Sequence, residues 1–398
     1  MARSFLFLLQ PVALVLTLSC GVVLAAGDRK PVLPINKQDR SAEQAQIAAL
    51  VRDLGAPTFT VRQQAQRRLI GLGATAKNAL EAACHDPDRE IQRRAKAALN
   101  AVNDIDFYVR LEAFRADSDP ADAHGLAGWD RFRASAGASS PARRLFVEMQ
   151  RAERELLELT ERAPRLAGTL LDSRCQQAQA AAAGGEDDHR PVLSLGSIAA
   201  IVFAASAPDV PVSMHAGDCI NGFARQTALS QALHAKQMSP VLQGLLGTWV
   251  GREFERESIT AYRNLIMAMQ YNLKDAIAPA LALVEPPGGQ PHLEQYAILA
   301  IGKLGDRKHV PALLPLLNDS RSVGVPDRTG RQSDTQIRDV ALAALVHLTG
   351  QKLSDYGFVH AKSNPLILFN TNTLGFNDPA ERDQALAKWR SWWAEHGK

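Results

Sequence analysis

Cysteine is scarce in this chain, and its scarcity excludes two classes of small protein. Only four cysteines occur among 398 residues. They form no Cys-x-x-Cys pair and are too few for a disulfide-stapled scaffold, which excludes a cysteine-rich secreted domain and a paired-cysteine zinc fold. The class of fold must therefore be read from the hydrophobic pattern.

An excess of one charge is also absent. The 45 basic and 42 acidic residues leave a formal net charge of +3, which argues against generic nucleic-acid binding. With 46% hydrophobic and 22% charged residues, the composition is that of a globular chain rather than a disordered one. We expect a folded protein with no nucleic-acid partner.

Apolar runs that approach the length of a membrane span are confined to the first 26 residues. Arg3 precedes the apolar stretch, and the small residues Ala25 and Ala26 precede the charged run Asp28–Lys30. This order is typical of a cleaved secretory signal. An uncleaved anchor and a lipoprotein processed at Cys20 are the open alternatives. All three predict an exported protein (periplasmic, cell-surface or secreted), and only the uncleaved or lipidated forms would contact a membrane, through the N-terminus.

A 30-residue internal repeat is the strongest positive signal. The recurring residues are Leu50, Pro57, Val61, Ala65 and Leu69, which return as Leu80, Pro87, Ile91, Ala95 and Leu99. The spacing of the last three returns in Leu293, Ala297 and Ile301, and again in Ile337, Ala341 and Leu345. Such self-similarity is typical of stacked helical pairs, in which each pair buries its apolar face on a neighbour. The pattern predicts an all-α chain.

Four short stretches give the chain a resemblance to HEAT repeats. They are Val61–Ala65, Ile91–Ala95, Leu293–Ala297 and Ile337–Ala341. Arg62 and Arg338 match the basic residue that the family usually has after the aliphatic one, whereas Gln92 and Glu294 depart from it. The resemblance implies an armadillo-like α-solenoid of stacked antiparallel helix pairs that binds other macromolecules, and it implies no chemistry.

The C-terminal part is similar to uncharacterised exported bacterial HEAT-repeat proteins. In those proteins the array ends in Leu-Thr-Gly followed by a Trp-rich helix, here Leu348–Gly350 and Trp389–Trp393. A repeat array needs its open end covered, so we expect an irregular segment and a Trp-rich capping helix after the last repeat.

These patterns divide the chain into six expected segments. They are a signal peptide (1–26), a linker (27–41), an N-terminal HEAT-like repeat pair (42–104), a helical connecting region with an exposed loop (105–190), helical and HEAT-like repeats (191–350) and the irregular segment with its capping helix (351–398). Within them, 141–161 has helical periodicity, and 197–206 is apolar all round, which predicts a buried helix. Whether residues 105–275 continue the array stays open.

The second helices of the N-terminal repeats are basic and give the first candidate binding site. Nine Lys or Arg residues face five Asp or Glu residues between positions 51 and 100. Arg62, Arg67, Arg93 and Arg94 could meet an acidic protein segment or an anionic polysaccharide on the concave side of a solenoid. An ordinary solvated face is the alternative interpretation.

A second candidate site is the insertion at 319–334, which carries Arg321, Arg328 and Arg331 among glycines and a proline. It lacks the Gly-Lys-Ser/Thr ending and the preceding strand of a phosphate loop. Because insertions in repeat proteins map to one face and often bind partners, these arginines are candidate binding residues. A spacer without a ligand is the alternative.

Cys175 and Cys219 are the pair that we would choose for a disulfide in an oxidising compartment, with free thiols as the alternative. With His189 and His215 they could also supply zinc ligands or a Cys–His pair. Only His215 and Cys219 are separated by a helical interval, so the spacing is not diagnostic. We therefore predict no catalytic residue, no metal and no cofactor.

The functional prediction is a non-catalytic protein–protein interaction scaffold of the cell envelope, whose partner is another protein, with an acidic protein among the candidates. One alternative is a HEAT-like lyase-type enzyme or enzyme accessory that holds a small ligand, which would need a pocket joining His215 and Cys219 to a carboxylate. The other alternative is a structural envelope spacer. The oligomeric state stays open.

Overall fold

The computed structural model describes residues 37–397 except 118, 120, 184–192, 224–225, 256–257 and 325–334. In these ranges the regular secondary structure is helical apart from one small hairpin and an isolated bridge, which confirms the predicted all-α class. Among the described helices, none has the length and apolar character that crossing a bilayer requires.

Several features expected from the sequence lie outside the described residues. They are the signal peptide, most of the linker, the exposed loop at 184–190 with His189, and Arg328 and Arg331. The chain forms two compact units, which meet in sequence between Val102 and Asn103. Each unit has a separate hydrophobic core and is described by itself.

The first unit is built from the 30-residue repeat. Its elements are α1 (Lys37–Asp53), α2 (Phe59–Leu72), η1 (Gly73–Ala76), α3 (Lys77–Ala83) and the start of α4 (Arg89–Ala116). α1 packs against α2 and α3. The small residues Ala65 and Ala95 are buried beside Leu69 and Leu80, so the repeated apolar positions form this core. Asp88 accepts a hydrogen bond from the Glu90 N–H (2.8 Å) at the start of α4.

The second unit contains the remaining elements. Its helices are the end of α4, α5 (Trp129–Ala136), α6 (Ser140–Arg162), α7 (Pro164–Ala183), α8 (Leu195–Ala205), α9 (Met214–Phe223), α10 (Thr227–His234), α11 (Ser239–Val250), α12 (Ile259–Tyr271), α13 (Ile277–Val284), α14 (Pro291–Leu304), α15 (Val310–Leu313), α16 (Ile337–Leu348) and α17 (Pro379–His396). Short 3-10 turns are η2 (Lys274–Ala276), η3 (Arg307–His309), η4 (Leu314–Asn318), η5 (Leu353–Tyr356) and η6 (Thr371–Thr373). β1 (Ser363–Asn364) pairs antiparallel with β2 (Leu368–Phe369).

The apolar helix α8 lies at the centre of the N-terminal half of this unit. Ser194 caps it by accepting a hydrogen bond from the Ser197 N–H (3.1 Å), and every residue from Gly196 to Ala205 is buried. α8 packs against α6, α7 and α11. A Cβ atom at Gly196 would lie 2.6 Å from the Glu148 carbonyl oxygen, so only glycine permits this approach of α8 to α6. The helix is therefore held from several sides.

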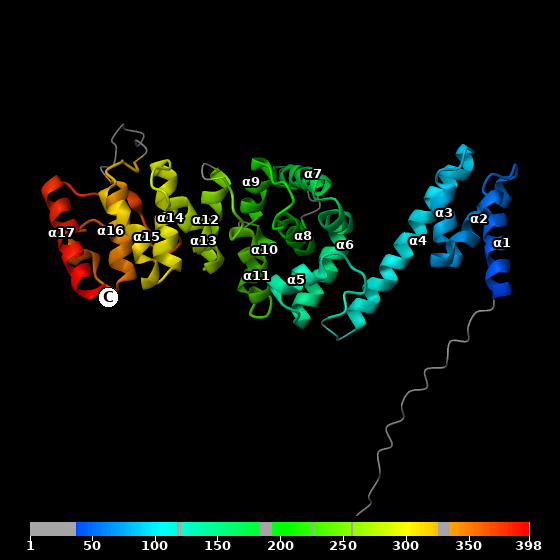
Figure 1. Cartoon of the computed structure of the whole chain (residues 1–398), viewed down its shortest axis with the longest axis horizontal. Helices are drawn as coiled ribbons and strands as arrows, with labels where there is room; N and C mark the ends of the chain where they lie inside the picture. The colour runs from blue at the N-terminus through cyan, green and yellow to red at the C-terminus, as the bar shows by residue number, and fades with distance from the viewer. Residues whose placement is uncertain are drawn as a thin grey trace, which may run out of the picture. The chain divides into compact units, whose positions relative to one another are not determined.

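In the C-terminal half of the unit, the helices contact others that lie one or two places away in chain order. α14 packs against α12, α13 and α16, while α13 also contacts α15. In Figure 1, α12 to α17 follow one another along this part of the unit. Ala297, Ala300, Ala341 and Ala344 are fully buried, and such small residues allow neighbouring helices to approach closely.

The last helix is joined to this stack by a buried ion pair. Asp378 caps α17 by accepting a hydrogen bond from the Ala380 N–H (2.9 Å). Arg382 Nε donates to Asp339 Oδ1 of α16 (2.9 Å), and both side chains are almost fully buried. Trp389 is fully buried as well. α17 is thus anchored by a specific polar contact and an aromatic ring.

Candidate functional site

The predicted arginines of the first unit converge on one carboxylate. Glu90 forms ion pairs with Arg62 (3.2 Å), Arg93 (2.7 Å) and Arg94 (2.7 Å). The hydrogen bonds from Arg94 and Arg93 hold the pKa of Glu90 below its ordinary value. Of the four candidates, only Arg67 is exposed without an ion pair to a described residue. Three of these four arginines therefore form their ion pairs within the unit.

Arg321 is likewise occupied by acceptors of the chain. It forms ion pairs with Asp319 and with Glu294 (2.8 Å), and it donates to the Gly289 carbonyl oxygen. The Asp319 hydrogen bond, which outweighs burial, raises the pKa of Arg321. The guanidinium joins the start of the insertion to α14. Its contacts are those of a structural residue, and the other two predicted arginines of the insertion are not described.

Cys175 and Cys219 lie side by side between α7 and α9. Both are buried free thiols, and Cys219 Sγ lies 3.7 Å from the Cys175 carbonyl oxygen. The hydrogen-bonded Cys219 side chain and burial raise the pKa of the Cys175 thiol. Held in its protonated form, the Cys175 thiol is a poor nucleophile and a poor metal ligand, whereas the hydrogen bond with Cys175 lowers the pKa of the Cys219 thiol. The disulfide between them stays a prediction, and the structure holds both residues as free cysteines.

A basic groove occurs where the sequence analysis did not expect one. A cavity of about 730 Å³ lies between the end of α4 and the first half of α6. Its arginines are Arg115, Arg143, Arg144 and Arg151, and its two carboxylates are Asp117 and Glu148. We call this cavity the arginine groove. The sequence carried a weak signal for it, since three of the arginines recur along one stretch of a predicted helix.

The arginines of the groove differ in how firmly they are held. Arg143 donates to the carbonyl oxygens of Phe114 and Asp117 (2.9 Å for the latter), and its guanidinium lies 4.0 Å from the Phe114 ring centroid. Arg115 and Arg151 share Glu112, at 2.7 and 2.8 Å.

Arg144 is the free cation of the groove. It is exposed and forms no hydrogen bond or ion pair with any described residue. The groove thus combines a fixed arginine, two that share one acid, and one that is unpaired.

The loop after α4 brings together three side chains that could hold a metal ion. The ligand atoms of Asp117, Asp122 and His124 all lie within 4.8 Å of one another. His124 Nε2 lies 2.9 Å from Asp117 Oδ2, and Asp122 Oδ1 accepts from the His124 N–H (2.7 Å). These hydrogen bonds account for the arrangement without an ion. No sequence motif pointed to this cluster, although its members lie within eight positions.

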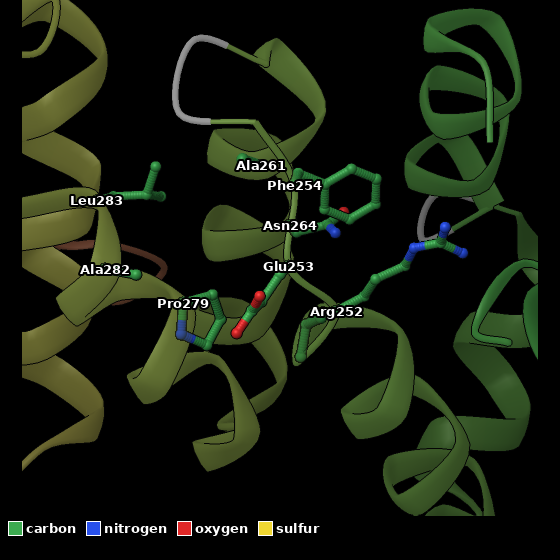
Figure 2. A pocket seen from close by; sticks show the side chains of 9 residues that line it. Arg252, Glu253, Phe254, Ala261, Asn264, Pro279, Ala282 and Leu283 are labelled. Atoms are coloured by element: carbon green, nitrogen blue, oxygen red, sulfur yellow. The ribbon is translucent and has the colours of Figure 1, made fainter. Parts of the chain in front are cut away.

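A smaller pocket with a more apolar lining lies beside α12 (Figure 2). Its volume is about 110 Å³, and its walls come from the end of α11, the following loop, α12 and α13. Phe254, Pro279 and Leu283 provide apolar walls, and Asn264 provides an amide. Neither His215 nor Cys219 lines this pocket or the arginine groove.

Comparison with known proteins gives no family for the chain. No protein-family model matches it, and no curated protein is similar to it. The function is therefore inferred from the geometry of the described residues.

Proposed function

We propose that the protein is a non-catalytic, exported interaction scaffold of the cell envelope, and that its arginine groove binds an acidic segment of a partner protein. The observation that carries the proposal is the unpaired Arg144 in a cavity lined by four arginines and two carboxylates, of which Arg115 and Arg151 are paired with the nearby Glu112. The volume of the cavity lies in the range of ligand sites, roughly 300–1,000 Å³.

Carboxylate is the ligand group that best matches the groove. Guanidinium groups bind carboxylates through paired, planar hydrogen bonds. Arg143 is held in place by carbonyl oxygens, and its position against an aromatic ring limits the entropy that binding would cost. Arg115 and Arg151 already sit on the Glu112 carboxylate, so a partner carboxylate would repeat a contact that the chain itself makes.

The architecture that we propose is a HEAT-like α-solenoid, closed at its C-terminal end by a Trp-rich cap. Its support is the packing of α12 to α16 on helices one or two places away in chain order and the repeated buried small residues of α14 and α16. The burial of Trp389 and the Arg382–Asp339 ion pair support a cap. A stack of this kind presents side chains from successive helices on a continuous surface, which suits binding rather than turnover.

The test is the binding of a fluorescein-labelled (Glu-Asp)₆ peptide to the full chain, measured by fluorescence anisotropy, with a (Gly-Ser)₆ peptide as the neutral reference. We expect selective binding of the acidic peptide that weakens as salt rises. Arg144→Ala should weaken it about fivefold, since one exposed charge pair contributes about 1 kcal/mol.

The control variant is Arg162→Ala, because Arg162 is exposed near the other end of α6. It should leave the affinity unchanged. Equal binding of both peptides, or equal effects of the two substitutions, would contradict the proposal. If the groove preferred an anionic polysaccharide such as heparin, the polysaccharide would replace the acidic peptide as the proposed ligand.

The two alternatives make different predictions. Absence of any anionic ligand would favour a structural spacer. Consumption of a metabolite by the purified full chain would favour a lyase-type enzyme.

A further inference from the structure

An exposed apolar stripe lies on α4, in the part of this helix that belongs to the second unit. Its residues are Ile105, Tyr108 and Val109, which are 52%, 57% and 63% exposed. They are spaced at i, i+3 and i+4, so they lie on one face of the helix. Single exposed apolar residues are common on protein surfaces, whereas a contiguous group marks a site of contact. We call this group the α4 stripe.

The α4 stripe and the arginine groove share one face of α4. Arg115 and Ala116 line the groove, and each follows a residue of the stripe, Tyr108 or Val109, by seven positions. Seven residues complete about two helical turns, so the side chains of the stripe and of the groove lie on the same side of the helix. All of these residues are exposed. The two features therefore form one surface, which is apolar along α4 and basic at the end of α4.

α6 borders this surface and runs antiparallel to α4. Asp104, near the start of this part of α4, forms an ion pair with Arg154 (2.9 Å). Asp117, directly after α4, accepts a hydrogen bond through its carbonyl oxygen from Arg143 (2.9 Å). A later position on α4 thus meets an earlier position on α6. A groove between two antiparallel helices has the shape that a third helix fills.

We propose that the acidic partner segment is an amphipathic helix, whose acidic residues lie in the arginine groove and whose apolar residues pack on the α4 stripe. The acidic contact rests on the proposed function, and the apolar contact is new. A helix satisfies its own backbone hydrogen bonds. An extended segment would hold backbone N–H and C=O groups against the aliphatic side chains of Ile105 and Val109, which offer no hydrogen-bonding group.

The charges at the groove limit how acidic the partner can be. Arg144 is unpaired among the described residues, and Arg115 and Arg151 share the single carboxylate of Glu112. Each guanidinium has five N–H donors, so these arginines retain donors for a further carboxylate. Glu148 is exposed at the groove and makes no ion pair with a described residue, so it would repel a long acidic run. A short acidic turn followed by apolar residues two turns later fits best.

The test compares two fluorescein-labelled peptides of equal composition by fluorescence anisotropy with the full chain. The matched peptide, Glu-Ala-Gln-Glu-Ala-Gln-Gln-Leu-Ala-Gln-Leu-Leu-Gln-Ala-Gln, places its acids and leucines on one helical face with the spacing of the α4 surface. The control peptide, Ala-Glu-Gln-Ala-Gln-Glu-Gln-Leu-Ala-Gln-Leu-Leu-Gln-Ala-Gln, moves the acids to another face. We expect the matched peptide to bind roughly tenfold more tightly, because only this peptide engages the groove and the stripe together.

Substitutions on the stripe separate its contribution from that of the groove. The double variant Ile105→Gln, Val109→Gln should weaken binding of the matched peptide roughly tenfold, because it removes apolar surface that the leucines bury. It should leave the affinity for (Glu-Asp)₆ unchanged. Both positions are exposed and glutamine is a good helix former, so α4 should persist. Leu166→Gln is the control, since Leu166 is 61% exposed on α7, and it should leave both affinities unchanged.

Arg144→Ala should weaken binding of both the matched peptide and (Glu-Asp)₆. If (Glu-Asp)₆ binds through Arg144, but the two helical peptides bind equally or the stripe variant keeps its affinity for the matched peptide, the helix is overturned and the proposed function stands. If (Glu-Asp)₆ does not bind, the proposed function and the helix are both overturned. Sedimentation velocity tests for a second copy of the chain as the occupant. A dimer that is lost in the stripe variant and that the matched peptide does not dissociate would assign the stripe to self-association and overturn the proposal.

Discussion

At the scale of single residues, most of the charge that the sequence offers for binding is neutralised by the chain itself. Glu90 engages three arginines of the first unit, and Arg321 is held by Asp319 and Glu294. Arg144, which no local pattern singled out, is unpaired among the described residues. The number of basic residues in a segment is therefore a poor guide to where a partner binds.

The Glu90 cluster gives a prediction with a defined pH dependence. Because the hydrogen bonds from Arg94 and Arg93 lower the pKa of Glu90, its carboxylate stabilises the first unit above its ordinary pKa of about 4.5. This contribution is lost as pH falls through the lower, folded-state pKa. Glu90→Gln should therefore make residues 59–99 exchange amide hydrogens faster at pH 7, and the difference from wild type should shrink at acidic pH.

Glu81→Gln is the matched control, since Glu81 is exposed on α3 and its side chain forms no ion pair with a described residue. It should leave exchange in residues 59–99 unchanged. An equal effect of both substitutions would mean that the convergence of arginines on Glu90 contributes nothing specific.

At the scale of elements, the contact between α6 and α8 sets the interior of the second unit. α8 is apolar on all sides, so it can be stable only when other helices surround it. It carries glycine where the α6 backbone comes closest. Glu153 of α6 adds a polar link, because its carboxylate accepts hydrogen bonds from Arg174 of α7 (2.8 Å) and Ser197 of α8 (2.5 Å).

Substituting Gly196 tests this packing. Gly196→Ala should destabilise the second unit by about 1–3 kcal/mol, the usual cost of inserting a methyl group into a packed contact. Urea unfolding followed by tryptophan fluorescence measures it, because all five tryptophans lie in the second unit.

Gly222→Ala is the control, since a Cβ atom there would meet nothing within 4 Å. It should be neutral or stabilise the unit by roughly 0.5–1 kcal/mol. If both alanines behaved alike, the close approach of α6 and α8 would not be a constraint.

At the scale of the whole molecule, the chain consists of two units with separate hydrophobic cores, and α4 runs through their boundary in the sequence. Separate cores permit separate unfolding. The first unit contains neither tryptophan nor tyrosine after residue 37. Fluorescence therefore reports on the second unit alone, while far-UV circular dichroism reports on both.

We expect two unfolding transitions in the full chain. Leu69→Ala, in the first core, should lower the free energy of unfolding of the first unit by about 2–5 kcal/mol. It should leave the fluorescence transition in place. Leu299→Ala, in the second core, should shift the fluorescence transition by a similar amount. A single transition that either substitution shifts would mean that α4 couples the units into one cooperative structure.

The sequence by itself determined the helices and their buried faces. The repeat between positions 50 and 99, the apolar stretch at 197–206 and the periodicity at 141–161 each predicted a helix that is present. These predictions hold because periodicity, caps and turn residues act over a few neighbouring positions.

Only the tertiary structure decided which polar groups are free. The arginine groove joins the end of α4 to α6, and the buried amide of Asn264 on α12 has no hydrogen-bond partner among the described residues. Whether an arginine or an amide finds a partner depends on side chains distant in sequence, and no local pattern encodes their distances.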